Sequence, residues 1–381
     1  MARTTQLHTD RGNPKLKFLD RYVGIPIVTA LALARRARGR RPVPSDWNTI
    51  GLFVTAGIGD AVLLTGVLHD LRAARPDARI VLFVTANNAA FSRLVDGPDE
   101  VVELPVRQVW SAVQQVRDQH CDVIVDFGAW RRFDAVLSAL SGARATVGLR
   151  TAGQYRHYGF DVVVDHHRDH EIDNDRRLIA TVGIESRSLP TIPVDAAAPS
   201  PHDAPYVVLH LWPGGANYEE RSWPEDRWFE LARGLNARGL DVVLTGGPED
   251  AEATEALAAA WRAEGARARS VAGTSWTETL VWLRHASGTI SVNTGVMHVA
   301  AAVGVPTIAL NGPTSGRRWG PVGVHTRSVA SPMIPDGYLN LGFERNEHYR
   351  DSMLGITVGV VLDAWDHLCV EVAGSAHRPR G

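Results

Sequence analysis

The chain has 381 residues, of which 45% are hydrophobic and 22% charged, with 40 Lys and Arg against 42 Asp and Glu. A net charge of -2 is not the basic excess of a nucleic-acid-binding protein, and the length favours two domains over one. Cys121 and Cys369 are too few for a disulfide framework or a cysteine metal site, so we expect a reduced, cytoplasmic environment.

Residues 1–48 form a distinct N-terminal segment, in which a polar start is followed by an apolar run at 15–34. A basic cluster follows the run, formed by Arg35, Arg36, Arg38, Arg40 and Arg41. The run is too short to span a bilayer, and it is not followed by a signal-peptide cleavage site. Two interpretations remain open. Residues 15–41 either lie on the inner face of the cell membrane, with arginines on anionic headgroups, or form a helix packed on the domain surface.

Residues 49–195 alternate between apolar runs typical of strands and segments typical of helices. Strands are predicted at 50–55, 79–85, 100–104 and 122–126, and helices at 61–74, 89–95 and 108–119. Strands that alternate with helices at this spacing predict a parallel, doubly wound sheet.

Residues 196–381 repeat this pattern after a linker rich in proline and alanine at 190–205. Strands are predicted at 206–210, 241–245, 289–292 and 307–310, and helices at 228–238, 251–264, 277–285, 296–303 and 358–370. The sequence therefore predicts an α/β fold of two Rossmann-like domains facing a central cleft. Ligands of such sheets bind at the carboxyl ends of the strands.

The segment 291–298 joins a predicted strand to a predicted helix. The free amides of a first helical turn and the positive end of its dipole form an anion site. Thr294 would add a hydroxyl donor, Gly295 would allow close approach of the backbone, and His298 could reach the same phosphate. The alternative is that Asn293 or Thr294 is a simple N-cap and that His298 is a packing residue.

A second turn, Gly57-Ile-Gly-Asp60, follows the first predicted strand. Its glycine spacing is shorter than that of the dinucleotide-binding fingerprint. Asp60 is either a capping residue or a general base, and we expect the helix N-terminus to hold it ionised.

A third segment, 212–224, is a glycine-rich turn with a basic residue near its end. Arg221 could neutralise a leaving diphosphate. The alternative is a surface arginine in an arginine-rich chain.

Five short motifs occur in order between residues 49 and 321: Gly59-Asp60, Arg221-Ser-Trp-Pro224, Val292-Asn-Thr-Gly-Val-Met-His298, Asn311-Gly-Pro-Thr314 and Trp319-Gly-Pro321. Together they resemble glycosyltransferase family 9, the heptosyltransferase-like enzymes. The resemblance implies a GT-B fold and an inverting transfer of a sugar from a nucleotide diphosphate to an acceptor hydroxyl. It implies neither a metal nor another cofactor.

The resemblance also implies roles for single residues. Asp60 would be the base that activates the acceptor hydroxyl, with Gly59 beside it. Arg131 is a weaker acceptor-side candidate from its place after a strand. The donor diphosphate would be held by Arg221, Thr294, Gly295 and His298, and the ribose by Glu249, with Asp250 and Glu252 as alternatives.

One residue departs from the family pattern: Asn293 stands where the family usually has Asp. The amide removes a charge beside the diphosphate and leaves the donor open, with ADP- and GDP-linked sugars favoured. The acceptor would be a glycan, a lipid-linked sugar or a small molecule. The segment 18–26 resembles a leader found on many family members, which is compatible with a lipid-linked acceptor.

Two other functions compete with this one. A nucleotide-sugar epimerase would share the double-Rossmann plan and act on the donor alone. A nucleotide-sugar-binding protein without turnover would bind the donor and yield no product.

Three charged groups receive a structural interpretation. Asp173-Asn-Asp175 is expected to carry helix-start charge before a helix at 176–182, and no metal. The histidines at 166, 167 and 170 are expected in a solvated or acceptor-side loop. Arg131 and Arg132 are interpreted first as solvated arginines.

Overall fold

The computed structural model describes residues 18, 20–215, 218–341, 344 and 346–376. These residues divide into two compact units, the first ending at Pro193 and the second beginning at Val194. The polar start expected at residues 1–13 lies outside the described residues.

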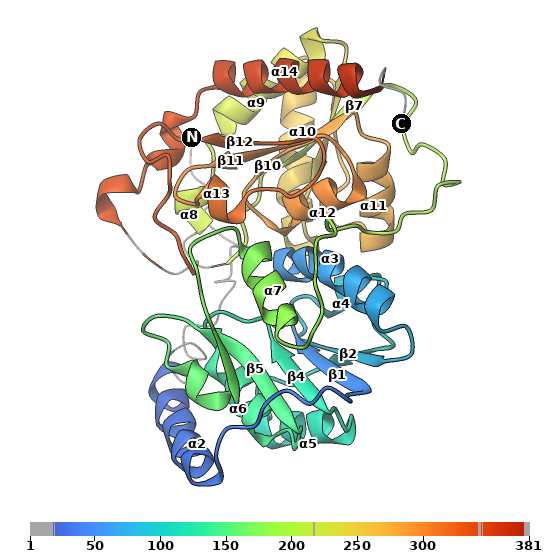
Figure 1. The fold of residues 1–381 in the computed structure, drawn as a ribbon. Coiled ribbons are helices and arrows are strands. Elements are labelled where there is room, and N and C mark those ends of the chain that lie inside the picture. The colour runs from blue at the N-terminus through green and yellow to red at the C-terminus, as the bar shows by residue number, and fades with distance from the viewer. Residues whose placement is uncertain (1–17, 19, 216–217, 342–343, 345, 377–381) are drawn as a thin grey trace. The chain divides into compact units, whose positions relative to one another are not determined.

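The first unit is built on a six-stranded sheet in the order β3-β2-β1-β4-β5-β6 (Figure 1). All pairs are parallel, as the alternation of strands and helices predicts. The strands are β1 (Thr49–Phe53), β2 (Arg79–Val84), β3 (Glu100–Glu103), β4 (Val123–Asp126), β5 (Ala145–Arg150) and β6 (Val162–Asp165). The helices are α2 (Gly24–Arg38), α3 (Ile58–Ala74), α4 (Ala89–Ser92), α5 (Val109–Asp118), α6 (Arg132–Leu140), the 3-10 turn η1 (Arg156–Gly159) and α7 (Glu171–Ala180).

The second unit repeats the plan, with the order β12-β11-β10-β7-β8-β9 and only parallel pairs. Its strands are β7 (Tyr206–His210), β8 (Asp241–Thr245), β9 (Ala268–Ser270), β10 (Gly288–Val292), β11 (Thr307–Asn311) and β12 (Thr326–Ala330). Its α-helices are α8 (Tyr218–Arg221), α9 (Glu225–Ala237), α10 (Ala251–Ala263), α11 (Trp276–Arg284), α12 (Gly295–Val303), α13 (Gly316–Trp319) and α14 (Val358–Ala376). Three 3-10 turns complete it, η2 (Pro248–Asp250), η3 (Glu347–Tyr349) and η4 (Ser352–Gly355). The prediction of two Rossmann-like sheets is confirmed.

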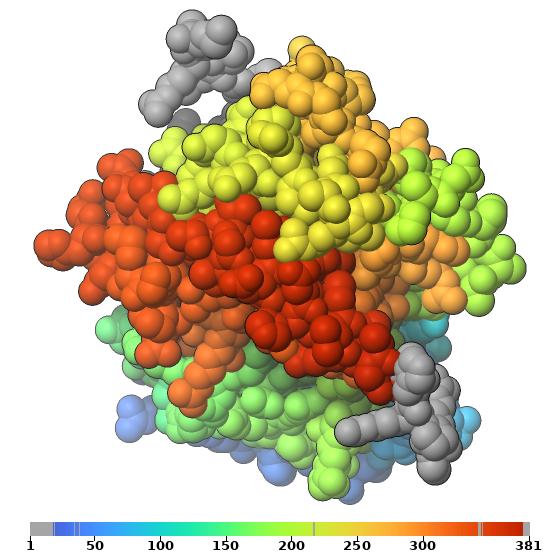
Figure 2. All heavy atoms as spheres, turned by 90° about the horizontal axis from the view of Figure 1, so that it is seen from above, coloured from blue at the N-terminus to red at the C-terminus, as the bar shows by residue number. Residues whose placement is uncertain are grey.

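The central strands of each sheet, among them β4, β7 and β10, are buried on both faces, because helices cover a parallel sheet on either side. In the second unit, α14 lies against α9, and Figure 2 shows these two helices side by side on one face. α14 also packs closely on the sheet. A Cβ at Gly288 in β10 would lie 2.4 Å from the ring of Trp365 on α14.

The helix α2 packs on α6 and η1 of the first unit. Val28 is fully buried in a cluster with Ala135, Val136 and Phe160. Arg35 forms an ion pair with Asp161 at 3.2 Å and is 7% exposed, so the expectation that it lies on lipid headgroups is wrong. Just before α2, both carboxylate oxygens of Asp20 contact the start of α6.

This N-terminal part exposes several large apolar side chains. The exposed side chains are those of Phe18, Tyr22, Val23, Ile27 and Leu33. Among the described residues, no single helix is long and apolar enough to cross a membrane, while the bent pair Glu347–Gly355 and Val358–Ser375 passes on length and composition together.

The chain leaves the first unit along α3. Asp70 of α3 accepts hydrogen bonds from Ser186, Arg187 and Ser188, and the Thr65 hydroxyl accepts one from the backbone of Thr191. Although partial burial raises the pKa of Asp70, these hydrogen bonds hold it down at about 2.

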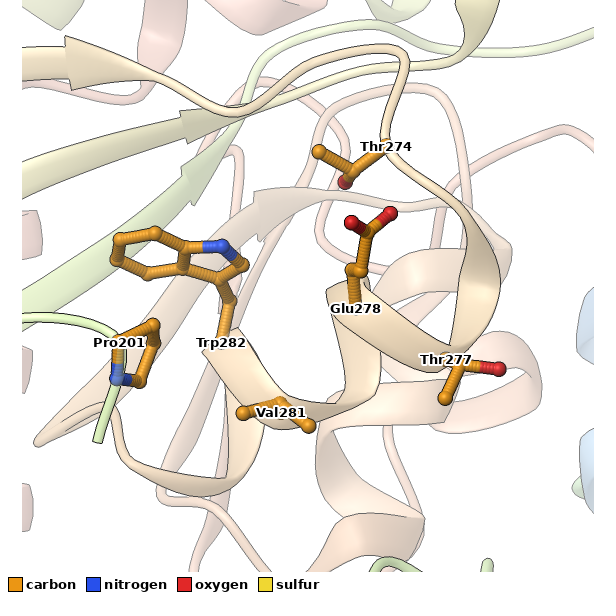
Figure 3. Close-up of a pocket in the computed structure, with 6 residues that line it drawn as sticks. All are labelled: Pro201, Thr274, Thr277, Glu278, Val281 and Trp282. Carbon is orange, nitrogen blue, oxygen red and sulfur yellow. The ribbon is translucent and has the colours of Figure 1, made fainter. Parts of the chain in front are cut away.

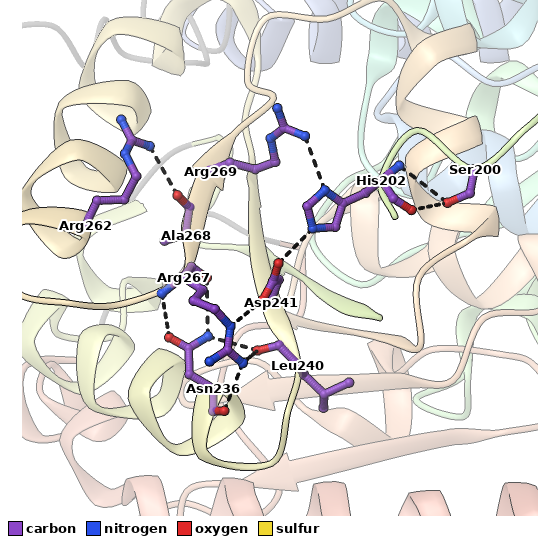
Figure 4. Close-up of polar contacts among 9 residues, drawn as sticks. All are labelled: Ser200, His202, Asn236, Leu240, Asp241, Arg262, Arg267, Ala268 and Arg269. Atoms are coloured by element: carbon purple, nitrogen blue, oxygen red, sulfur yellow. Dashed lines mark hydrogen bonds and ion pairs between the residues drawn. The ribbon is translucent and has the colours of Figure 1, made fainter. Parts of the chain in front are cut away.

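The chain enters the second unit at the edge of its sheet (Figure 4). His202 contacts Asp241 of β8 at 2.8 Å and Arg269 of β9 at 3.4 Å. Asp241 also pairs with Arg267 at 2.5 Å. The segment that connects the two units, the connector, is therefore hydrogen-bonded at both ends. Its first end is held to α3, and its second end is held to β8 and β9.

Candidate active site

Both sheets have the strand order of a dinucleotide-binding fold, in which ligands bind where the order reverses. In the first unit this switch point lies between β1 and β4, and in the second between β7 and β10. The turn after β1 leads into α3, whose first residues include Gly59 and Asp60, and Arg131 ends the loop after β4. The loops after β7 and β10 lead to Arg221 and Thr294. The structure thus brings Asp60 and Arg131 to one switch point, and the Gly-rich turn and the start of α12 to the other.

Asp60 is the third residue of α3, which begins directly after the glycine-rich turn. Its Oδ2 accepts the backbone N–H of Gly57 at 2.9 Å. Gly57 is extended and a Cβ there would lie 3.2 Å from the same oxygen, so the small residue leaves room for the carboxylate.

The environment of Asp60 raises its pKa to about 6, chiefly by burial and then by the negative charge of Glu171. The hydrogen bonds from Gly57 and from its own backbone, and the charge of Arg131, act in the opposite direction. The sequence predicted that the helix N-terminus would hold Asp60 ionised. Burial and the charge of Glu171 outweigh this effect on the pKa of Asp60. A carboxylate with a pKa near neutrality is mostly ionised at pH 7 and is a better proton acceptor than an ordinary Asp.

Arg131 is held rather than solvated. Its Nη1 donates to the carbonyl oxygen of Thr55 at 2.5 Å, and its guanidinium lies 5.4 Å from the ring centre of Trp130. Arg132 is 3% exposed and pairs with Asp20 at 3.0 Å, so its interpretation as a solvated arginine is wrong.

The sequence analysis did not predict a buried polar network that lies near the ends of β1 and β4. Asp126 at the end of β4 pairs with Arg156 at 2.5 Å, and both side chains are fully buried. Asp134 accepts the hydroxyl of Thr55 at 2.6 Å. Burial, and then the charge of Asp126, raise the pKa of Asp134 to about 7. The signal available in the sequence was an Asp at the end of a buried strand, which is a costly place for an unpaired charge.

A second polar cluster, which the sequence analysis placed in a loop, lies at the start of α7, which packs against α3 (Figure 1). The carboxylate of Glu171 contacts His166 Nε2 at 3.1 and 3.2 Å and accepts Asn174 Nδ2 at 3.2 Å. His166 Nδ1 lies 3.1 Å from the hydroxyl of Thr151. The His166 side chain is 3% exposed, so this residue is not in a solvated loop, whereas His167 is exposed. The helix begins at Glu171, five residues earlier than expected, and Asp173–Asp175 lie within its first turns.

In the second unit, the motif 291–298 is the end of β10 and the first turn of α12. Thr294 occupies the N-cap position, but its side chain makes no capping hydrogen bond. The interpretation of Thr294 as a simple N-cap is therefore wrong. Gly295 is the first helical residue, and His298 is 5% exposed on the first turn. A helix N-terminus without a side-chain cap retains amide donors and positive potential for an anion.

Asn293 does not serve as the N-cap of α12 either. Its Nδ2 donates to Asn311 Oδ1 and to the backbone carbonyl of Trp319, both at 2.8 Å. The amide therefore joins the ends of β10 and β11 to the last residue of α13.

Arg221 ends the short helix α8, and its guanidinium donates to the carbonyl oxygen of Gly214 in the glycine-rich turn after β7. Gly215 has a φ of +82°, which favours glycine, and a Cβ there would lie 3.4 Å from Arg221 Nη2. The arginine is thus attached to the turn at the switch point.

The acidic residues after β8 differ in their surroundings. Asp250 is 1% exposed, and its carboxylate accepts the N–H of Gly247 at 3.0 Å. Glu249, one residue earlier, is exposed at the carboxyl end of the strand. Of the two, Glu249 is the more accessible, while Asp250 supports the turn.

A pocket of about 290 Å³ lies elsewhere, beside α11 (Figure 3). Its walls are Pro201, Thr274, Thr277, Glu278, Val281 and Trp282, none of which belongs to the motifs above. Within the described ranges, no group of three or more His, Cys, Asp or Glu side chains is arranged to hold a metal ion.

Residues 109–336, more than half of the chain, match the model of glycosyltransferase family 9 (heptosyltransferase). The chain is 33% identical over 167 residues to lipopolysaccharide heptosyltransferase 2 of Escherichia coli, which is 43% of this chain and 47% of that protein. It is 37% identical over 115 residues to lipopolysaccharide heptosyltransferase 1 of Pseudomonas aeruginosa, 29% of this chain and 30% of that protein. The aligned parts thus span less than half the length of these relatives.

Solved structures share the fold. The E. coli ADP-heptose lipopolysaccharide heptosyltransferase II matches with a TM-score of 0.67 and 20% identity, covering 85% of this chain and 99% of that one. A glycosyltransferase family 9 protein of Veillonella parvula matches with a TM-score of 0.69 and 19% identity, covering 86% and 98%. At these identities the likeness establishes the architecture, two Rossmann-like units of the GT-B kind.

Proposed function

The chain belongs to glycosyltransferase family 9, and from this premise we propose that it transfers a heptose or a related sugar from a nucleoside diphosphate to an acceptor hydroxyl. The transfer inverts the anomeric centre and needs no metal. Asp60 is the general base.

The observation that carries the proposal is the setting of Asp60. The carboxylate lies at a switch point, is fixed by the N–H of Gly57 and has a pKa raised to about 6. General bases work best when their pKa lies near the operating pH. No other carboxylate among the sequence-derived candidates combines these features in the described structure.

The donor site is proposed at the switch point of the second unit. The amides at the start of α12, with Thr294 and Gly295, receive the diphosphate, while Arg221 neutralises charge as it leaves. His298 lies on the same turn and Glu249 binds the ribose. An ADP-linked donor is favoured, because a solved family relative of this fold is the E. coli heptosyltransferase WaaC with ADP. A GDP-linked donor is the alternative.

The reaction follows from these placements. Asp60 removes the proton of the acceptor hydroxyl, and the oxygen forms a bond to the anomeric carbon as the bond from that carbon to the diphosphate breaks. The negative charge that develops on the leaving diphosphate is stabilised by the start of α12 and by Arg221. Since the charge is met by amides and a guanidinium, no step needs a metal.

Substitution of Asp60 by Asn tests the base. The amide oxygen can still accept the N–H of Gly57, so the turn is kept and only proton removal is lost. We expect kcat to fall by roughly 10²–10⁴-fold with little change in donor binding. Near-normal transfer by this variant would rule out Asp60 as the base, and Asp77→Asn, at an exposed site in the same unit, controls for charge removal alone.

The donor is tested by thermal unfolding with ADP-, GDP- and UDP-sugars, because a ligand of the native state raises its stability. Incubation of the best donor without an acceptor separates the alternatives. An epimerase would convert the donor alone, and a binding protein would release no nucleoside diphosphate with any acceptor. Turnover that persists unchanged in EDTA would support the metal-independent mechanism, and a loss restored by a divalent ion would contradict it.

Lipid-linked glycans are the proposed acceptor class, together with peripheral contact at the inner face of the membrane. This part of the proposal rests on the exposed Phe18, Tyr22 and Leu33 and on the neighbouring exposed Arg36 and Arg40. Such a surface suits an anionic lipid interface. Cosedimentation with vesicles that contain phosphatidylglycerol should exceed that with neutral vesicles, and Phe18→Ser with Tyr22→Ser should reduce it. Leu354→Ser, an exposed site in the second unit, is the control, and an equal loss there would count against the assignment.

A further inference from the structure

The chain that follows β12 returns to the loop after β11 and is held there by its backbone. The N–H groups of Tyr338 and Leu339 both donate to the carbonyl oxygen of Pro313, at 2.8 and 2.9 Å. Gly337 has a φ of +61°, and a Cβ there would lie 2.4 Å from the backbone nitrogen of Ser315. The glycine therefore permits an approach that a side chain would prevent, and the approach places Tyr338 beside the end of β11.

The side chain of Tyr338 reaches a different loop of the same unit. Its hydroxyl donates to the carboxylate of Glu220 in α8. Burial, and then this hydrogen bond, raise the pKa of Tyr338, so the phenol keeps its proton and remains a donor. Hydrogen bonds to a charged acceptor are stronger than those between neutral groups. Because α8 has only four residues, its position depends on such outside contacts.

Arg221 follows Glu220 directly in α8, so the contact with Tyr338 bears on the position of the arginine. The guanidinium donates to the carbonyl oxygen of Gly214 in the glycine-rich turn. Two residues further on, Trp223 is 3% exposed, and its Nε1 donates at 2.9 Å to a backbone carbonyl just after η4. Arg221 is thus held on its C-terminal side by the indole and on its N-terminal side by Tyr338 acting on Glu220.

The same tyrosine connects α8 to the start of α12 through the end of β11. Its N–H contacts Pro313, which lies two residues after Asn311. Asn311 in turn accepts the side-chain amide of Asn293 at 2.8 Å, at the end of β10. A continuous series of contacts therefore joins Arg221 to the first turn of α12, the two places where the donor diphosphate is proposed to bind.

We propose that Tyr338 is a positioning residue for the donor diphosphate: by holding Glu220 to the loop after β11, it fixes α8 so that Arg221 meets a diphosphate received at the start of α12. A group that is already held in its bound position loses less entropy when the ligand binds. Tyr338 acts through Arg221 and contacts no donor atom. The inference rests on the proposed donor site.

The test is the binding of ADP to wild type and to Tyr338→Phe, measured by calorimetry well below the unfolding temperature of either protein. The variant keeps the ring and removes only the hydroxyl. We expect the Kd for ADP to rise roughly three- to tenfold, and kcat/KM for the donor to fall by a similar factor while KM for the acceptor is unchanged. An unchanged Kd would overturn the proposal.

Tyr349→Phe is the matched control, since Tyr349 lies in the same part of the chain, in η3. Its hydroxyl makes no hydrogen bond to any residue that the structure describes. Its replacement should leave the affinity for ADP unchanged. An equal loss in both variants would mean a general effect on this part of the fold and would contradict the proposal.

Substitution of Glu220 tests the hydrogen bond from the other side. Glu220→Gln retains an oxygen that accepts the phenol and should keep most of the affinity, whereas Glu220→Ala should match Tyr338→Phe. The double variant Tyr338→Phe with Glu220→Ala should bind ADP no more weakly than either single variant, because both remove one interaction. Losses that add in full would refute the contact as the cause.

Arg221→Ala separates this inference from the proposed function. In that background Tyr338→Phe should cause little further loss, and the same loss in both backgrounds would show that Tyr338 does not act through Arg221. If Arg221→Ala binds ADP weakly but Tyr338→Phe binds it normally, the inference alone fails. If Arg221→Ala binds ADP as wild type does, the proposed donor role of Arg221 fails and the inference fails with it.

Discussion

Asn293 and Trp319 are joined by a hydrogen bond of 2.8 Å from the side-chain amide of the first to the backbone carbonyl of the second. The second amide hydrogen of Asn293 serves Asn311, whose Oδ1 is also 2.8 Å away. Both partners accept, so the position requires a donor, and a carboxylate at 293 has none to offer. The departure from the family's usual Asp thus has a local structural role, in addition to any effect on donor charge.

Asn293→Asp should therefore weaken the donor site. A carboxylate would leave the Trp319 carbonyl without its partner, while the side chain of Asn311 can turn its amide toward the new charge. We expect a loss of stability of about 1–3 kcal/mol and weaker binding of the donor, measured by chemical denaturation and by calorimetry. Unchanged affinity and stability would show that the hydrogen bond between Asn293 and Trp319 contributes nothing to the free energy of unfolding or of donor binding.

Asp134 should make stability depend on pH. Its folded-state pKa of about 7 exceeds the ordinary 3.8, so folding favours its protonated form. Its contribution is complete below about pH 4 and is lost as the pH rises toward 7. Asp134→Asn removes this dependence, and the free energy of unfolding should exceed that of wild type by roughly 1–3 kcal/mol at pH 8 and approach or fall below it at pH 4. Parallel curves for the two proteins would contradict the assignment.

Asp20 should anchor the N-terminal part of the chain. Its Oδ1 accepts the N–H groups of Arg132 and Phe133 at the start of α6, and its Oδ2 pairs with the buried Arg132. Asp20→Ala removes a cap and strands a buried charge, so we expect a loss of about 2–5 kcal/mol in the free energy of unfolding. Asp46→Ala, which breaks the exposed ion pair to Arg144, should change it far less, because solvent screens the charges of an exposed pair. Equal effects of the two substitutions would refute the anchoring role.

Gly66 should tolerate no side chain. A Cβ at this position on α3 would lie 2.5 Å from the carbonyl oxygen of Ser188. Gly66→Ala must push the connector from α3, and we expect about 1–3 kcal/mol of destabilisation in a thermal or urea melt. Gly359→Ala is the control, because a Cβ there meets no atom within 4 Å and alanine favours the helix α14. A melt of Gly66→Ala that matches wild type would show that this contact yields without cost.

Periodicity predicted the elements that are apolar and bounded by turn residues. β1, β7 and β10 lie within a residue of their predicted starts, because buried parallel strands read as short apolar runs. Four strands were not predicted: the short β9, the partly exposed edge strands β6 and β12, and β5, whose apolar residues are interrupted by Thr146 and Gly148. The helix α6 was also missed, because its first turn contains Arg132 and Asp134, whose burial depends on partners distant in the chain.

The candidate site residues show the same limit: those placed by a local pattern could be predicted, and contacts between distant parts of the chain could not. Asp60 and Thr294 could be found because a local strand, turn and helix puts them at a strand end. The partners of Asp60 could not, since Glu171 approaches α3 only through the packing of α7. His166 was recognised as part of a histidine-rich segment, but its contact with Glu171 depends on the fold of the loop between β6 and α7.

The attachment of both connector ends also determines where the chain can be interrupted. Backbone or side-chain hydrogen bonds hold residues 186–188 and 191 to α3, and His202 is held to β8, whereas the side chains of residues 195–197 are exposed. Insertions are tolerated where the backbone is exposed and makes few hydrogen bonds or packing contacts. A reporter domain, a protease site or new termini therefore belong at residues 195–197. Placed a few residues earlier, the same insertion would pull on the helix that carries Asp60.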